Sequence, residues 1–143
     1  MVAEEYKDIA PFDDEQFSQK MEKLVNDPGF ENAIKYVLPG SDFRELAATL
    51  RKIDNKEDFQ KKVMLSILRR LEEGTTDGVT DSGLENIDLA QPRLYMSNHR
   101  DIVLDASFLG LVMIRHGLPA QEVALGDNLL IYEWIENLVR LNK

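Results

Sequence analysis

One short stretch of the sequence combines a histidine with two aspartates: residues 95–105 read "YMSNHRDIVLD". A neutral imidazole has a pKa near ~6.5, so His99 can take a proton from a hydroxyl during attack on an acyl carbonyl and return it to the leaving group. A carboxylate on the other ring nitrogen would fix the tautomer and stabilise the imidazolium. Asp105 is the first candidate for that carboxylate and Asp101 is the second. The same residues also fit a capped helix start without catalysis.

The neighbouring hydroxyl residues do not suggest a covalent enzyme intermediate. Ser97 and Ser107 are close in sequence to His99, but neither has the flanking glycines of a nucleophile elbow. The hydroxyl of an acceptor substrate is then the better nucleophile, which favours direct acyl transfer.

The pattern around the histidine predicts alternating strands and helices. A short apolar run at 93–97 suggests a strand, 102–115 is apolar nearly all round as in a buried helix, 121–125 suggests a second strand, and 129–141 a last helix. This order predicts a parallel pair with a right-handed crossover. Ligands gather beyond the carboxyl ends of such strands, and 97–99 is the end of the first one.

The pattern of the sequence before residue 74 predicts only helices. Apolar residues recur at helical spacing, and Pro28-Gly29 and Pro39-Gly40 separate the segments. We expect Asp54 to cap the longest helix, whose apolar side should be buried and whose other side is filled by polar residues that include Gln60 and Glu72. The predicted class is therefore α/β: a helical region at 1–73, a loop at 74–92, and a β-α-β-α part at 93–143.

Composition excludes several classes of function. The chain has no cysteine and only two histidines, far apart, so we expect no metal site. A net charge of −9 argues against nucleic acid as a partner. The start is acidic, and no run approaches the ~18 apolar residues of a membrane span, so we expect a cytoplasmic protein.

The stretch "SNHRDIVLD" resembles the first block of the glycerolipid acyltransferase superfamily, Asn-His-x-Ser-x-x-Asp. The resemblance extends to "ALGDNLLIYEWIENLVRLNK" and to an acidic helical start, as in a bacterial subgroup of phospholipid acyltransferases. It implies that His99 is a general base on a glycerol-type hydroxyl, with an aspartate orienting it. It also implies acyl-CoA or acyl-carrier protein as donor, glycerol phosphate or a lysophospholipid as acceptor, no further cofactor, and peripheral contact with the inner membrane surface.

Other substrate-binding candidates surround this motif. Asn98 and Arg100 match its flanks, and Arg100 is the candidate phosphate contact. Asp127 and Asn128 follow the second predicted strand and either line the same site or simply form a turn and helix cap.

The chain departs from the family pattern in two ways. Five residues separate His99 from Asp105 where the family has four, and Asp101 takes the serine position. On a regular helix six residues turn through about 600°, so His99 must lie on the loop before the helix if it is to meet Asp105. The later family blocks do not follow, which leads us to expect an N-terminal fragment of a longer enzyme, inactive alone. The alternative is a non-enzymatic helical interaction or regulatory module.

Overall fold

The computed structural model describes residues 9–88, 91–98 and 100–142, and all the regular structure among them is helical. The expected α/β class is therefore wrong, because these residues contain no strand. They form two compact units, and each is described by itself. The first unit combines Met1–Val63 with Glu122–Lys143, and the second is Met64–Gln121.

The helices of the first unit begin at capping side chains. Asp13, Asp27 and Asp42 each accept a backbone N–H from the first turn of the helix that follows. Asn55 does the same for the next helix, one residue after the expected Asp54. Such caps satisfy N–H groups that have no partner inside the helix. The helices are α1 (Asp14–Val25), α2 (Pro28–Val37), α3 (Phe43–Leu50), α4 (Lys56–Phe59) and α7 (Glu133–Asn142).

The core of this unit is formed by the apolar faces that the spacing predicts. Phe17, Met21, Leu24 and Val25 on α1 are all buried, as expected from positions i, i+4, i+7 and i+8. The buried residues of α2 and α3 are Phe30, Ile34, Phe43, Ala47 and Leu50. These buried residues lie on the faces that the spacing predicts, whereas Val37, which the same spacing places on the apolar face of α2, is 46% exposed.

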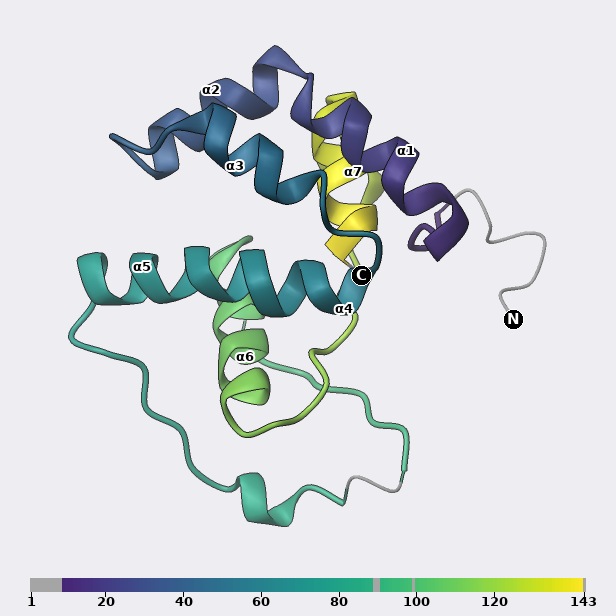
Figure 1. The fold of residues 1–143 in the computed structure, drawn as a ribbon. Coiled ribbons are helices and arrows are strands. Elements are labelled where there is room, and N and C mark those ends of the chain that lie inside the picture. Colours follow the sequence, from purple (N-terminus) through teal and green to yellow (C-terminus); the bar gives the residue numbers. More distant parts are fainter. Residues whose placement is uncertain (1–8, 89–90, 99, 143) are drawn as a thin grey trace. The chain divides into compact units, whose positions relative to one another are not determined.

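The last helix, α7, packs against the first, α1, although they are far apart in the sequence (Figure 1). The Phe12 N–H donates to the Arg140 carbonyl at 3.0 Å, and Arg140 Nε donates to the Ala10 carbonyl at 2.8 Å. The buried Gln60 amide donates to the Asn142 carbonyl at 2.5 Å. Backbone at both ends of the described chain is thereby joined within one core.

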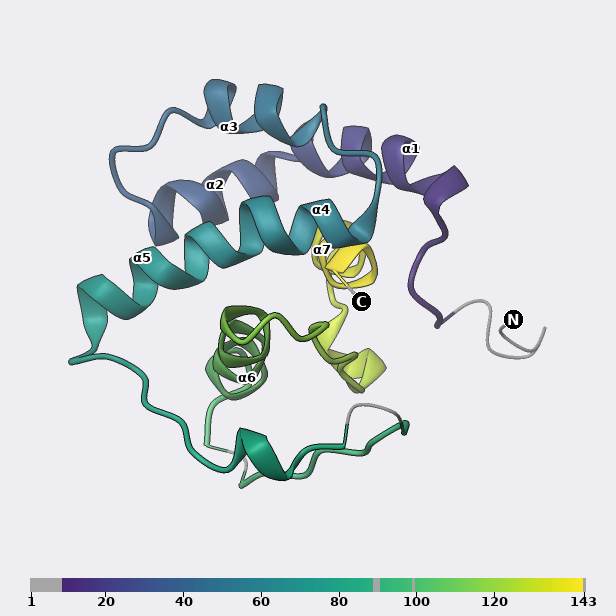
Figure 2. The same cartoon turned by 60° about the horizontal axis from the view of Figure 1, so that its bottom comes forward.

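The second unit is built on two helices, α5 (Leu65–Thr75) and α6 (Leu104–Arg115), which pack together (Figure 2). A π-helical turn, Gln60–Met64, precedes α5, and the boundary between the units falls within it. A long connection with a 3₁₀ turn, Leu84–Asn86, leads from α5 to α6. The buried apolar residues of the unit are Leu68, Leu111, Val112 and Met113.

Neither predicted strand forms in the described residues. Leu94 and Met96 are 86% and 88% exposed, so the run at 93–97 has no apolar layer to cover it. A strand needs a partner for its N–H and C=O groups, and neither the described residues of 93–97 nor those of 121–125 adopt strand structure. The last helix also starts later than expected, at Glu133, because the 3₁₀ turn Asp127–Leu129 precedes it. In the described part of the chain, no helix is long and apolar enough to span a bilayer.

Candidate functional site

Two aspartates hold the turn that leads into α6. Asp105 Oδ2 accepts the backbone N–H groups of Arg100 at 2.7 Å and of Asp101 at 2.9 Å. Asp101 Oδ1 accepts the N–H groups of Val103 at 2.8 Å and of Leu104 at 2.7 Å. Four backbone donors at a helix start are thus satisfied by two carboxylates, whose negative charge the helix dipole favours there.

His99 lies outside the described residues, so its pairing with either aspartate stays a prediction. The residues that follow it, Arg100–Val103, come before the first residue of α6 at Leu104. The flanking Asn98 and Arg100 are exposed to solvent. The structure therefore brings Arg100, Asp101 and Asp105 together in one turn, immediately after the predicted base.

The face of α6 that begins at Asp105 continues as the wall of an apolar cavity. Phe108, Leu109, Val112 and Met113 follow Asp105 at i+3, i+4, i+7 and i+8, which places them on one side of the helix. All four line a cavity of about 340 Å³ in the second unit. The opposite wall comes from the long connection and includes Val79, Leu84, Ile87 and Tyr95.

The distance between the turn and the cavity follows from helix geometry. At a rise of 1.5 Å per residue, Phe108 lies about 4.5 Å and Met113 about 12 Å farther along the axis than Asp105. Tyr95, on the opposite wall, is four residues before His99 in the sequence. A cavity of this kind is suited to an apolar ligand whose polar end lies near the turn.

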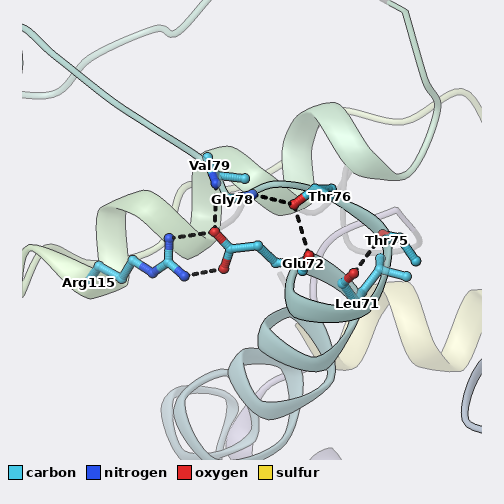
Figure 3. A network of polar contacts seen from close by, with 7 residues as sticks. All are labelled: Leu71, Glu72, Thr75, Thr76, Gly78, Val79 and Arg115. Carbon is cyan, nitrogen blue, oxygen red and sulfur yellow. Dashed lines mark hydrogen bonds and ion pairs between the residues drawn. The ribbon is translucent and has the colours of Figure 1, made fainter.

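A partly buried ion pair fixes the long connection to α6 (Figure 3). Glu72, 5% exposed, forms a bidentate pair with Arg115, in which Nη1 donates to Oε1 at 3.0 Å and Nη2 to Oε2. Glu72 Oε1 also accepts the Val79 N–H at 2.8 Å. The hydrogen bonds from Arg115 and then from Val79 lower the pKa of Glu72 below its ordinary value.

The sequence did not predict a structural role for Glu72. The helical pattern predicts Glu72 on the polar side of its helix, although Glu72 follows Leu68 by four residues and so shares the face of that buried leucine. That spacing was the available signal. The partner Arg115 is 43 residues away, and no local pattern connects the two.

The remaining predicted residues lie elsewhere. Asp127 and Asn128 belong to the 3₁₀ turn of the first unit and are exposed, so their role as substrate contacts stays a prediction. His116 follows α6, and its Nε2 lies 3.1 Å from an Asp81 oxygen. Across residues 9–88, 91–98 and 100–142, the acidic and histidine side chains form no cluster that could hold a metal ion.

Comparison of the chain with protein-family models, with curated proteins and with solved structures finds no match. The resemblance to the glycerolipid acyltransferases therefore stays a prediction from the sequence stretches 97–105 and 124–143.

Proposed function

We propose that the protein transfers a fatty acyl group from acyl-CoA or acyl-carrier protein to a hydroxyl of glycerol phosphate or a lysophospholipid. One observation carries this proposal. The turn held by Asp101 and Asp105 follows His99 directly, and the α6 face headed by Asp105 lines an apolar cavity. A predicted base and a cavity for an apolar chain thus belong to the same stretch of the same unit.

In the proposed reaction, the His99 imidazole removes the proton of the acceptor hydroxyl while its oxygen attacks the thioester carbonyl carbon. The tetrahedral intermediate then collapses, the carbon–sulfur bond breaks, and the imidazolium returns the proton to the leaving thiolate. The products are an ester and a free thiol, so no oxidant, reductant or metal is required. Asp105, with Asp101 as the second candidate, supports the imidazole, and Arg100 is the candidate contact for the acceptor phosphate.

The acyl chain fits the cavity by its chemistry. Apolar side chains form most of its wall, Asp81 is a charged residue among those that line it, and Asp105 lies three residues before Phe108 on α6. Burial of each methylene group is worth ~0.8 kcal/mol, so a chain that enters this space gains binding energy in proportion to its length.

Contact with a lipid surface is part of the same proposal. Leu94, Met96, Ile102 and Val103 surround His99 in the sequence, and each of the four is more than half exposed. Apolar side chains exposed around a catalytic turn would meet the acyl region of a bilayer without spanning it. A lipid acceptor could then reach the base without leaving the membrane surface.

The test uses the protein translated from its natural open reading frame. Release of free thiol from acyl-CoA and from acyl-carrier protein is measured with each acceptor class, and the ester product is identified by mass spectrometry. His99→Ala should lower the rate by about 10²–10⁴-fold. His116→Ala is the matched control, because it removes the other histidine of the chain, whose partner is Asp81. Absence of acceptor-dependent thiol release with both donors would rule out the proposal.

The alternative is a non-enzymatic helical interaction module. The observation that favours it is the first unit, whose described residues form an assembly of helices with its own core and with Tyr36 88% exposed at the end of α2. A module of this kind would bind a partner equally well with His99→Ala. Loss of thiol release in that variant therefore separates the two functions.

A further inference from the structure

We propose that the first unit binds a small amino alcohol, in which an ammonium group and a hydroxyl lie on neighbouring carbon atoms. The site is a polar cavity of about 660 Å³. It is lined by the second half of α1 and the turn after it on one side, and by Glu133 and Asn137 of α7 on the other. Cavities that bind small molecules have volumes of roughly 300–1,000 Å³. Every lining residue belongs to the first unit, so this inference is independent of the acyl transfer proposed for the second.

Asn137 is the residue that marks the polar cavity as a binding site. It lines the cavity although it is only 3% exposed, and among the described residues its side-chain amide has no hydrogen-bond partner. A buried amide without a partner lowers stability. The spacing of α7 would accept an apolar residue here, because the fully buried Leu141 follows four residues later on the same face. A ligand in the cavity supplies the bonds that the fold leaves unmade.

The amide of Asn137 offers both kinds of hydrogen bond. Its carbonyl oxygen accepts, and its NH₂ group donates. An ammonium group can only donate, whereas a hydroxyl also accepts. A ligand that carries the two groups on neighbouring carbon atoms therefore satisfies both ends of one amide.

Three carboxylates line the cavity, and two of them have fixed partners. Glu22 Oε2 accepts a bond from Arg51 Nε at 2.8 Å, and Asp27 caps α2 by accepting backbone N–H groups of its first turn. The described partner of Glu133 is Lys23, with Oε1 and Nζ 3.3 Å apart and both side chains more than half exposed. An exposed pair of this kind contributes little to stability, so Glu133 can exchange Lys23 for the ammonium group of a ligand.

The charge of the cavity wall favours a cation over an anion. The wall contains the carboxylates of Glu22, Asp27 and Glu133 and the ammonium group of Lys23, so negative charge is in excess. Glu133 and Asn137 are four residues apart and lie on one face of α7. In the proposed complex, the ligand ammonium donates to Glu133 and to the Asn137 carbonyl oxygen, and the ligand hydroxyl accepts from the Asn137 NH₂ group.

Three two-carbon probes that share a hydroxyl test the class of ligand. Ethanolamine is the cation, ethylene glycol the neutral compound and glycolate the anion. Each is titrated into the ¹⁵N-labelled full natural protein at neutral pH and constant ionic strength, and the side-chain NH₂ signals of Asn137 are followed by NMR. We expect a saturable shift with ethanolamine and a Kd on the order of millimolar, which is the range for so few atoms. Ethylene glycol and glycolate should bind at least tenfold more weakly.

Variants of Asn137 separate a binding role from a structural one. Asn137→Leu removes both hydrogen-bonding groups at similar size, so we expect at least tenfold weaker ethanolamine binding and a Tm of the free protein about 4 °C higher. Asn137→Ala, which cannot overpack, should lose binding to the same extent and stay folded. Asn32→Leu is the matched control, because it makes the same change at an exposed position of α2 and should keep the wild-type affinity. Backbone amide signals of α1 and α7 report binding in all variants.

Glu133→Gln tests the ammonium contact. It should weaken ethanolamine binding about fivefold, as expected for one exposed charge contact, and leave ethylene glycol binding unchanged.

Four results would overturn the proposal. The first is the absence of a saturable shift of Asn137 with ethanolamine, and the second is binding of glycolate or ethylene glycol as tight as that of ethanolamine. The third is wild-type affinity for ethanolamine in Asn137→Ala. The fourth is a lower Tm in both Asn137→Leu and Asn137→Ala with unchanged ethanolamine affinity, because the amide would then serve the fold alone.

Discussion

Replacing Gly29 with alanine tests how closely α7 packs on α2 in the first unit. A Cβ atom at this position would lie 2.5 Å from Nε1 and 2.7 Å from Cδ1 of the Trp134 ring. Ordinary contact begins at 3.4 Å, so the ring would have to move by 3.4 − 2.5 = 0.9 Å. Moving the Trp134 ring costs free energy, because the ring also packs near Phe30, with ring centroids 6.4 Å apart.

The expected size follows from two opposing effects. Overpacking costs about 1–3 kcal/mol, whereas alanine in place of glycine stabilises a helix by roughly 0.5–1 kcal/mol. We therefore expect Gly29→Ala to lower the free energy of unfolding by about 1 kcal/mol. In a Trp134→Ala background the clash with the ring is absent and the 3.0 Å contact with Asp27 Oδ1 remains, so Gly29→Ala should be neutral or stabilise by up to about 1 kcal/mol.

Urea unfolding followed by far-UV circular dichroism measures all four variants of this double-mutant cycle. The coupling between the two sites should be about 1–3 kcal/mol. Trp134 is the only tryptophan of the sequence, so a shift of its emission in folded Gly29→Ala reports the ring displacement directly. Equal stabilisation by Gly29→Ala in both backgrounds would show that the close contact does not exist.

Three further predictions concern the second unit. Leu109→Trp fills the cavity beside α6 and should shift the preference of acyl transfer toward shorter chains. Competition between acyl-CoA donors of different length measures this preference. An unchanged chain-length profile would exclude this cavity as the acyl site. The pKa of Glu72 is lowered in the fold by Arg115, so its contribution to stability is present above the unfolded value near 4.5 and is lost as the pH falls through the folded pKa. Glu72→Gln should therefore flatten the stability curve below about pH 4.5 in urea titrations, and an equally steep acid limb in the variant would contradict the assignment. The double variant Leu94→Glu, Met96→Glu should co-sediment less with phospholipid vesicles than the wild type. Tyr36→Glu, at an exposed position of the first unit, should co-sediment as the wild type does. Equal binding by both variants would exclude the turn as the lipid contact.

Helices of the first unit could be predicted because their signals are local. On α1, three or four residues separate each buried side chain from the next in the series Phe17, Met21 and Leu24. The cap Asp13 accepts the N–H of Gln16, three residues farther along. The two buried polar residues Gln60 and Glu72 could not be predicted in this way. Their partners, the Asn142 carbonyl and Arg115, are 82 and 43 residues away, and the π-helical turn Gln60–Met64 departs from the regular helical period.

The two predicted strands were wrong for a related reason. A short apolar run such as 93–97 fits a strand, but whether it becomes one depends on a neighbouring strand, and the described residues supply none. The candidate site was predicted in part. The types and spacing of Asp101 and Asp105 marked the turn, but their bonds to backbone N–H groups could not be inferred, because every residue of the turn carries such a donor.

The packing of α7 on α1 has a consequence for how the chain folds during synthesis. The second unit is inserted between the two segments of the first, so α1 is complete at Val25 while its partner ends at Asn142. At ~5–20 residues per second, the ribosome needs roughly 6–23 s to add the 142 − 25 = 117 residues between these points. During that interval the apolar face of α1 that α7 covers is open to other proteins. A chaperone that recognises exposed apolar helices should therefore bind nascent chains before the last helix emerges and release them afterwards.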